Sequence, residues 1–149
     1  MFKVVQIDHV ELFVPDRYEA ARWYESTLGL QPVPECEPWA VDGGPLMISS
    51  DGGSTKLALF EGQPVAAGQK AAFRRVAFRV TGSGFADFLR RLPELALKDS
   101  RDQAVTANSV VDHQQAYSIY FDDPYGHMLE VTTYDYDETA AFLRSMRVE

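Results

Sequence analysis

A histidine and an arginine occupy matching positions in two similar stretches of this sequence. The first stretch runs Asp8-His9-Val10-Glu11-Leu12-Phe13-Val14, and the second runs Arg74-Arg75-Val76-Ala77-Phe78-Arg79-Val80. An imidazole can hold a metal, whereas a guanidinium stays protonated and presents only donors. Those donors form a fork that matches a carboxylate or a phosphate. We therefore expect His9 to be able to hold a metal, and Arg75 to bind an anionic group of a small ligand.

Each stretch alternates like a half-buried strand, and the first is predicted to span residues 4–14. Its apolar positions are predicted to face helices, and its other positions, which include His9 and Glu11, are predicted to face a shared interior. Apolar residues at helical spacing predict a helix over residues 17–28 that stops at Gly29. A proline-containing irregular or edge strand follows, and then come strands over residues 46–49 and 56–60.

The second copy repeats this order. A strand over residues 73–80 leads through Gly82-Ser83-Gly84 into a helix, with Ser83 as the expected N-cap. The buried stripe of this helix is predicted to contain Phe85, Phe88, Leu89 and Leu92. Further strands are predicted over residues 103–112, 116–121 and 127–134, and a last helix over residues 137–147. A repeat of this size indicates two modules, over residues 1–62 and 71–149, joined by a linker over residues 63–70.

Size and charge exclude several classes of function. At 149 residues the chain is expected to form one domain, and its net charge of −8 indicates that it has no nucleic-acid partner. No apolar stretch approaches the length of a membrane span, so no membrane partner is expected. Cys36 is the single cysteine. An intrachain disulfide is therefore excluded, and a cytoplasmic location is favoured.

The doubled order of strand, helix and three strands resembles the vicinal oxygen chelate superfamily. Two motifs carry the resemblance, Asp8-His9-Val10 and the run Ser118-Ile119-Tyr120-Phe121-Asp122-Asp123-Pro124-Tyr125-Gly126-His127-Met128-Leu129-Glu130. The superfamily includes glyoxalase I, extradiol dioxygenases, fosfomycin-resistance enzymes and bleomycin-resistance proteins. The resemblance implies an α+β fold in which two βαβββ modules form a curled mixed sheet around a cup. It also implies a homodimer.

The resemblance further implies a divalent metal in the cup, held by His9 and Glu130. Zn, Fe, Mn or Ni would suit an imidazole and a carboxylate. The site is incomplete, because Arg75 occupies the position of the usual second histidine, and Glu11, His113 or water would have to complete it. In the alternative interpretation, His9 hydrogen-bonds a neighbour while Arg75 and Glu130 pair as ions, since a partly buried carboxylate needs a partner.

His113 and Tyr120 form a second group of candidates. Comparable residues in extradiol-like relatives assist proton transfer or orient the substrate, and histidine titrates in the range that suits this task. Alternatively, His113 closes a loop through a backbone carbonyl, and Tyr120 is a core aromatic. Arg79 either joins Arg75 in ligand binding or reaches solvent.

Two functions remain open at this point. The first is an enzyme, a lyase, isomerase or dioxygenase, that acts on a small, oxygen-rich and anionic organic molecule, with a metal if one is held. The second is a binding protein without chemistry that sequesters its ligand, like the bleomycin-resistance proteins. The incomplete ligand set supports the second function.

Overall fold

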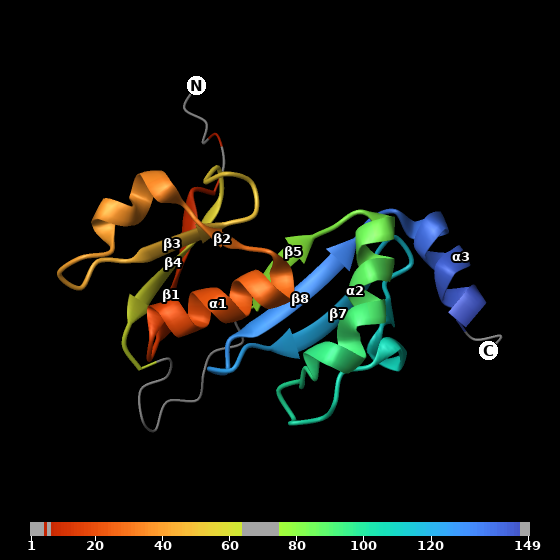
Figure 1. The fold of residues 1–149 in the computed structure, drawn as a ribbon. Coiled ribbons are helices and arrows are strands. Elements are labelled where there is room, and N and C mark those ends of the chain that lie inside the picture. The colour runs from red at the N-terminus through yellow and green to blue at the C-terminus, as the bar shows by residue number, and fades with distance from the viewer. Residues whose placement is uncertain (1–4, 6, 64–74, 147–149) are drawn as a thin grey trace. The chain divides into compact units, whose positions relative to one another are not determined.

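The computed structural model describes residue 5, residues 7–63 and residues 75–146 (Figure 1). The chain divides into two compact units, Met1–Lys70 and Ala71–Glu149. Each unit contains a strand, a helix and then three strands, so the predicted α+β fold of two βαβββ modules is confirmed. Of the linker predicted over residues 63–70, only Gln63 lies among the described residues. No described helix is both long and apolar enough to span a membrane.

The N-terminal unit is a four-stranded mixed sheet with one helix on it. Its elements are β1 (His9–Val14), α1 (Arg17–Leu28), β2 (Gln31–Pro32), a 3-10 helix η1 (Pro34–Trp39), β3 (Leu46–Ser49) and β4 (Lys56–Glu61). The strands lie in the order β1-β4-β3-β2, with β1 parallel to β4 and the other pairs antiparallel. The strand predicted over residues 4–14 begins only at His9 in the described part of the chain.

Helix α1 begins and ends where the sequence predicts. The Asp16 carboxylate accepts hydrogen bonds from the backbone N–H groups of Tyr18 and Glu19, both at 2.9 Å, and so caps the first turn. Gly29 follows the helix with a φ of 73°, a left-handed conformation that glycine adopts without steric cost. The helix buries Tyr24 completely and packs against β3 and β4.

Helix η1 contributes to an apolar cluster that includes the centre of the N-terminal sheet. The segment over residues 31–39 contains three prolines, and a proline has no backbone N–H to donate to a strand ladder. Only Gln31–Pro32 of this segment pairs, as an edge strand. Val33 and Cys36 pack with Met47 of β3 and Ala58 of β4, which are partners across the sheet. The cysteine thus belongs to the core.

The C-terminal unit repeats the arrangement and adds a helix. Its elements are β5 (Arg75–Arg79), α2 (Gly82–Leu95), a 3-10 helix η2 (Ala107–Ser109), β6 (Val111–Asp112), β7 (Tyr117–Asp122), β8 (Met128–Thr133) and α3 (Tyr136–Met146). The strands lie in the order β5-β8-β7-β6, with β5 parallel to β8. The final helix is confirmed up to Met146, the last described residue.

Two local predictions for this unit are wrong. Only Val111–Asp112 of the strand predicted over residues 103–112 is strand, because Thr106 and Ser109 form a reciprocal capping box that starts helix η2. The N-cap of α2 is Thr81 rather than Ser83. The Thr81 hydroxyl accepts the Gly84 N–H at 3.1 Å, and the helix therefore begins one residue before Ser83.

The core of the C-terminal unit lies between α2 and the sheet. The predicted stripe of α2, Phe85, Phe88, Leu89 and Leu92, is buried. Phe88 meets Phe121 of β7 with ring centroids 5.6 Å apart. Helix α3 lies against α2 (Figure 1), and Asp135 accepts a 2.8 Å hydrogen bond from the Gly82 N–H at the start of α2. A carboxylate at this helix N-terminus is favourable for the helix dipole.

Candidate functional site

The face of the C-terminal sheet opposite α2 carries most of the predicted site residues. We call it the distal face. Alternation along β5, β7 and β8 places on it Arg75, Ala77, Arg79, Ser118, Tyr120, Asp122, Met128, Glu130 and Thr132. The burial along β5 follows this alternation, since its distal positions are exposed and Val76 and Phe78 are half-buried. Alternation in the sequence predicted the faces of β5 and β8 correctly.

The strand register places most of the candidate residues of the distal face in two adjacent rows. One row contains Ala77, Glu130 and Tyr120, and the next contains Arg75, Met128 and Asp122. Glu130 and Tyr120 are direct partners on antiparallel strands. Side chains in the same or neighbouring rows of a sheet lie within reach of one another. A small molecule on this face can therefore contact several of them together.

Arg75, Tyr120 and His113 form a continuous chain of contacts. The guanidinium carbon of Arg75 lies 4.3 Å from the centroid of the Tyr120 ring. The Tyr120 hydroxyl lies 2.9 Å from Nε2 of His113, which follows β6. The side chain of His113 thus bonds a hydroxyl rather than the backbone carbonyl of the alternative prediction. The imidazole can exchange a proton with the phenol, and the guanidinium favours negative charge near the ring.

Glu130 is not the partner of Arg75. None of the ion pairs among the described residues joins them, contrary to the alternative prediction of an ion pair. The register explains this result, because Arg75 is level with Met128 and its guanidinium lies over Tyr120. Arg79 behaves similarly at the far end of β5, where its guanidinium carbon is 5.2 Å from the centroid of the Tyr134 ring.

Asp122 is a candidate that the sequence prediction missed. It lies on the distal face in the same row as Arg75. Burial raises the pKa of its carboxyl above the ordinary value, and the neighbouring carboxylates of Asp123 and Asp99 raise it further, while Arg75 opposes the shift. A carboxyl that holds its proton more tightly is suited to general acid chemistry. Its position two residues after Tyr120 was the available signal, since both belong to one face of β7.

Replacing Asp122 with asparagine is expected to raise the melting temperature at pH 7. A carboxyl with a raised pKa in the folded state stabilises the fold while it is protonated, below its unfolded value near 3.8, and that stability is lost as the pH rises through the folded value. Asparagine retains the neutral form at every pH. The difference in melting temperature between the variant and the wild type should therefore shrink as the pH approaches 3.8. Thermal unfolding followed by circular dichroism measures this difference. A lower melting temperature of the variant at pH 7 would contradict this account.

In the N-terminal unit, His9 belongs to a chain of charged groups. Asp8 accepts from Nδ1 of His9 at 2.8 Å and from the Lys56 ammonium at 3.0 Å. These two bonds, with that of His9 the larger cause, hold the pKa of Asp8 below its ordinary value. Nε2 of His9 lies 3.7 Å from a carboxylate oxygen of Glu11. His9 therefore hydrogen-bonds a neighbour, as the alternative interpretation predicted.

The same geometry fits a metal ligand. A neutral histidine that donates its Nδ1–H to a carboxylate presents the lone pair of Nε2, and this is the usual support of a metal-binding imidazole. Within the described residues, no group of three or more His, Cys, Asp or Glu side chains is placed to hold a metal by itself. His9 and Glu130 lie in different units. A metal held by both of them stays a prediction.

The two sheets place a carboxylate differently at equivalent positions. On β5 and β8 the paired residues are Ala77 and Glu130, whereas on β1 and β4 they are Glu11 and Ala58. Ala58 is 1% exposed within the apolar cluster under η1. The last strand of the first module therefore offers no acid at this level, and Glu11 is the carboxylate that its first strand supplies instead.

His127 lies in the turn between β7 and β8, but its ring is largely buried. Its side chain is 16% exposed, and Nδ1 lies 2.6 Å from the buried carboxylate of Asp123. The other oxygen of that carboxylate accepts the N–H groups of Tyr125 at 2.9 Å and of His127 at 2.8 Å. Asp123 thus organises the turn between β7 and β8, the strands that carry Tyr120 and Glu130.

Comparisons with known proteins agree with this architecture. A sequence model of the glyoxalase/bleomycin resistance protein/dioxygenase superfamily matches residues 6–131. The fosfomycin resistance protein FosX from Listeria monocytogenes has a similar fold, with a TM-score of 0.65 and 14% identity over 92% of this chain and 99% of that one. No curated protein matches the chain significantly.

Two further solved structures are similar. A glyoxalase/dioxygenase from Nostoc punctiforme gives a TM-score of 0.64 and 22% identity, over 87% of this chain and 90% of that chain. The oxidase ChaP-H1 gives a TM-score of 0.63 and 24% identity, over 87% of this chain and 96% of that one. The activities that these proteins are named for differ, and at these identities the similarity concerns the fold.

Proposed function

Because the chain belongs to the glyoxalase/bleomycin resistance protein/dioxygenase superfamily, we propose that it binds a small, oxygen-rich, anionic organic molecule on the distal face. The observation that carries this proposal is the contact chain from the Arg75 guanidinium over the Tyr120 ring to the His113 imidazole. Glu130 is the direct strand partner of Tyr120. A cation, a hydroxyl, an imidazole and a carboxylate therefore belong to one face of a single unit.

Each of these groups has a distinct role in the proposal. Arg75 binds the anionic group of the ligand, and Arg79 extends the positive charge along β5. The Tyr120 hydroxyl orients an oxygen of the ligand, while His113 gives or takes a proton through that hydroxyl. Asp122, in the row of Arg75, is a second proton donor.

The enzymatic form of the proposal includes a divalent metal, Zn, Fe, Mn or Ni. His9 would hold it through Nε2 and Glu130 through its carboxylate, with Glu11 as a further ligand. A bound metal would polarise the oxygens of the substrate as a Lewis acid. The support is the 2.8 Å contact between His9 Nδ1 and the Asp8 carboxylate, because an imidazole that donates from Nδ1 presents the lone pair of Nε2.

Sequestration without chemistry is the second candidate, and two observations favour it. Arg75 stands where relatives carry a histidine ligand, and its positive charge opposes a cation nearby. Ala58 is packed among Val33, Cys36 and Met47, so the last strand of the first module supplies no acid at the position equivalent to Glu130. A ligand would then bind to Arg75 and the neighbouring hydrogen-bonding groups alone.

Calorimetry with salicylate, a small anion with adjacent oxygens, tests the proposal and separates the two candidates. Chelator-treated protein and protein supplied with Zn²⁺ are titrated in parallel. The enzymatic form predicts tighter binding with Zn²⁺ and a loss of the metal-dependent gain in the variant His9→Ala. Equal affinity in both preparations favours sequestration. Absence of binding to salicylate and to a panel of catechol, oxalate and benzoate would overturn the proposed function.

The assembly and the location of the chain are part of the same proposal. The family resemblance supports a homodimer, for which sedimentation would give twice the chain mass of 16.7 kDa. The single, buried Cys36 supports a cytoplasmic location, because a reducing compartment needs no disulfide framework.

A further inference from the structure

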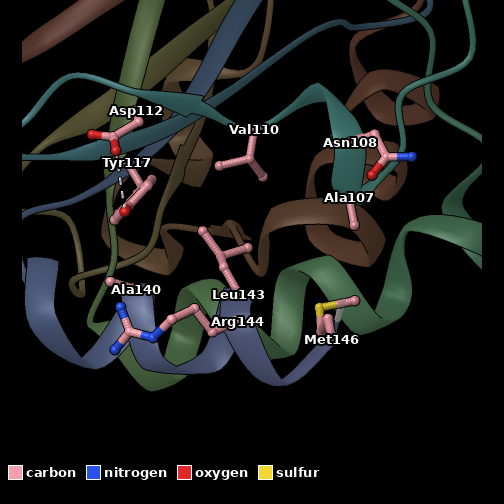
Figure 2. Close-up of a pocket in the computed structure, with 9 residues that line it drawn as sticks. All are labelled: Ala107, Asn108, Val110, Asp112, Tyr117, Ala140, Leu143, Arg144 and Met146. Carbon is pink, nitrogen blue, oxygen red and sulfur yellow. Dashed lines mark hydrogen bonds between the residues drawn. The ribbon is translucent and has the colours of Figure 1, made fainter. Parts of the chain in front are cut away.

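A groove in the C-terminal unit lies outside the distal face. It has a volume of about 290 Å³, between the C-terminal half of α3 and the segment from η2 to β6, and it is lined by Ala107, Asn108, Val110, Asp112, Tyr117, Ala140, Leu143, Arg144 and Met146 (Figure 2). Asp112 and Tyr117 are strand partners. Alternation along β6 places the side chain of Asp112, and with it that of its partner Tyr117, on one face of the sheet. Val111 and His113 belong to the opposite face. The groove is therefore separate from the proposed ligand site.

Both signs of charge occur at one end of this groove. Figure 2 shows the carboxylate of Asp112 and the guanidinium of Arg144 at the same end. The N–H of Gln114, at 2.7 Å, and the hydroxyl of Tyr136, at 2.9 Å, donate to Asp112 and hold its pKa below the ordinary value. Tyr117 also donates to it, at 3.3 Å. The carboxylate is thus fixed in position and negatively charged at neutral pH.

The guanidinium of Arg144 makes no hydrogen bond or ion pair with any residue that the structure describes. Its side chain is exposed in the last turn of α3. Asp112 and Arg144 do not approach within ion-pair distance of each other. A fixed anion and an available cation that do not neutralise each other can each pair with an opposite charge on one ligand.

The rest of the groove is apolar. Val110 and Leu143 lie beyond the charged end, and Met146 lies further along (Figure 2). Met146 is 39% exposed, so it retains apolar surface that a ligand could cover. A volume of 290 Å³ equals about ten water molecules at roughly 30 Å³ each, which is enough for a molecule of the size of an amino acid.

We propose that this groove binds a zwitterionic α-amino acid with a medium-sized apolar side chain. The ammonium group pairs with Asp112, the carboxylate pairs with Arg144, and the side chain packs against Val110, Leu143 and Met146. The stacked rings of Tyr117 and Tyr136, with centroids 4.7 Å apart, keep the Asp112 end of the groove in place.

A ligand series tests this site without altering the fold. The full chain, with labelled methyl groups, is titrated with L-leucine, with isocaproate, which lacks the amine, and with isoamylamine, which lacks the carboxylate. L-leucine should shift the methyl resonances of Val110, Leu143 and Met146, and each truncated analogue should bind roughly tenfold more weakly. Equal affinity for leucine and isocaproate would overturn the zwitterion proposal. So would the absence of methyl shifts at about 10 mM leucine, where even weak binding is visible.

Two variants complete the test. Arg144→Gln removes the cation at an exposed position and should weaken leucine binding roughly tenfold. Arg101→Gln removes an exposed arginine from the loop near Asp99 and should leave the affinity unchanged. Equal affinities of the Arg144 variant and the wild type would remove the assigned carboxylate contact. Because salicylate binding is measured on the opposite face, failure of the groove proposal leaves the proposed function intact.

Discussion

Replacing Asp123 with alanine is expected to destabilise the protein by about 3 kcal/mol, because several charge-assisted hydrogen bonds to a buried carboxylate are lost together. The side chain of Asp123 is fully buried. It accepts the N–H groups of Tyr125 and His127 and contacts the His127 ring. Alanine leaves these donors without a partner in a turn that joins β7 to β8.

Urea unfolding measures the loss, and two other variants calibrate it. Asp87→Ala removes a carboxylate that is 72% exposed and paired with an exposed arginine, so it should cost less than about 0.5 kcal/mol. Asp123→Asn retains one accepting oxygen and should fall between the two. If Asp123→Ala unfolded at the same urea concentration as Asp87→Ala, the turn would not depend on the buried carboxylate.

Replacing Arg75 with alanine is expected to weaken salicylate binding between about tenfold and a hundredfold, the range that hydrogen bonds to a charged group provide. The guanidinium contributes the positive charge of the Arg75 row and lies over the ring of Tyr120. Arg75→Lys keeps the charge but loses the fork of donors, so its affinity should be intermediate. Isothermal calorimetry gives these affinities directly.

The matched control for Arg75 is Arg90→Ala. Arg90 is exposed on α2, pairs with Asp87 and lies on the helix that covers the opposite face of the C-terminal sheet. Its removal changes the net charge equally and should leave the salicylate affinity unchanged. An Arg75→Ala variant that binds as tightly as wild type would show that the anion does not bind at this guanidinium.

Much of the site could be predicted because alternation along a strand is a local property. The apolar residues of β1 and β5 identified the face that packs on a helix, and so placed Arg75 on the other face. The strands predicted over residues 116–121 and 127–134 are confirmed as β7 and β8, and the short turn between them makes Tyr120 and Glu130 strand partners. Helix α2 was predictable for the same reason, since its buried stripe recurs at helical spacing.

The features that the sequence did not predict depend on contacts with distant or competing partners. The segment before β6 has residues that suit a strand, but the reciprocal cap between Thr106 and Ser109 closes a 3-10 helix instead. The burial of His127 follows from its bond to Asp123, four residues earlier, rather than from its own neighbours. The raised pKa of Asp122 depends partly on Asp99, which no periodicity connects with it.

The most direct test of the central claim is a measurement of Overhauser contacts between salicylate and the isotope-labelled full-length chain. The claim is that Arg75, Tyr120 and His113 act together as one ligand site. It predicts contacts from the ring protons of salicylate to the Tyr120 ring and to the His113 imidazole, and their loss in Arg75→Ala. Contacts confined to Val110 and Leu143, or no contact to Tyr120 when the protein is saturated with salicylate, would contradict it.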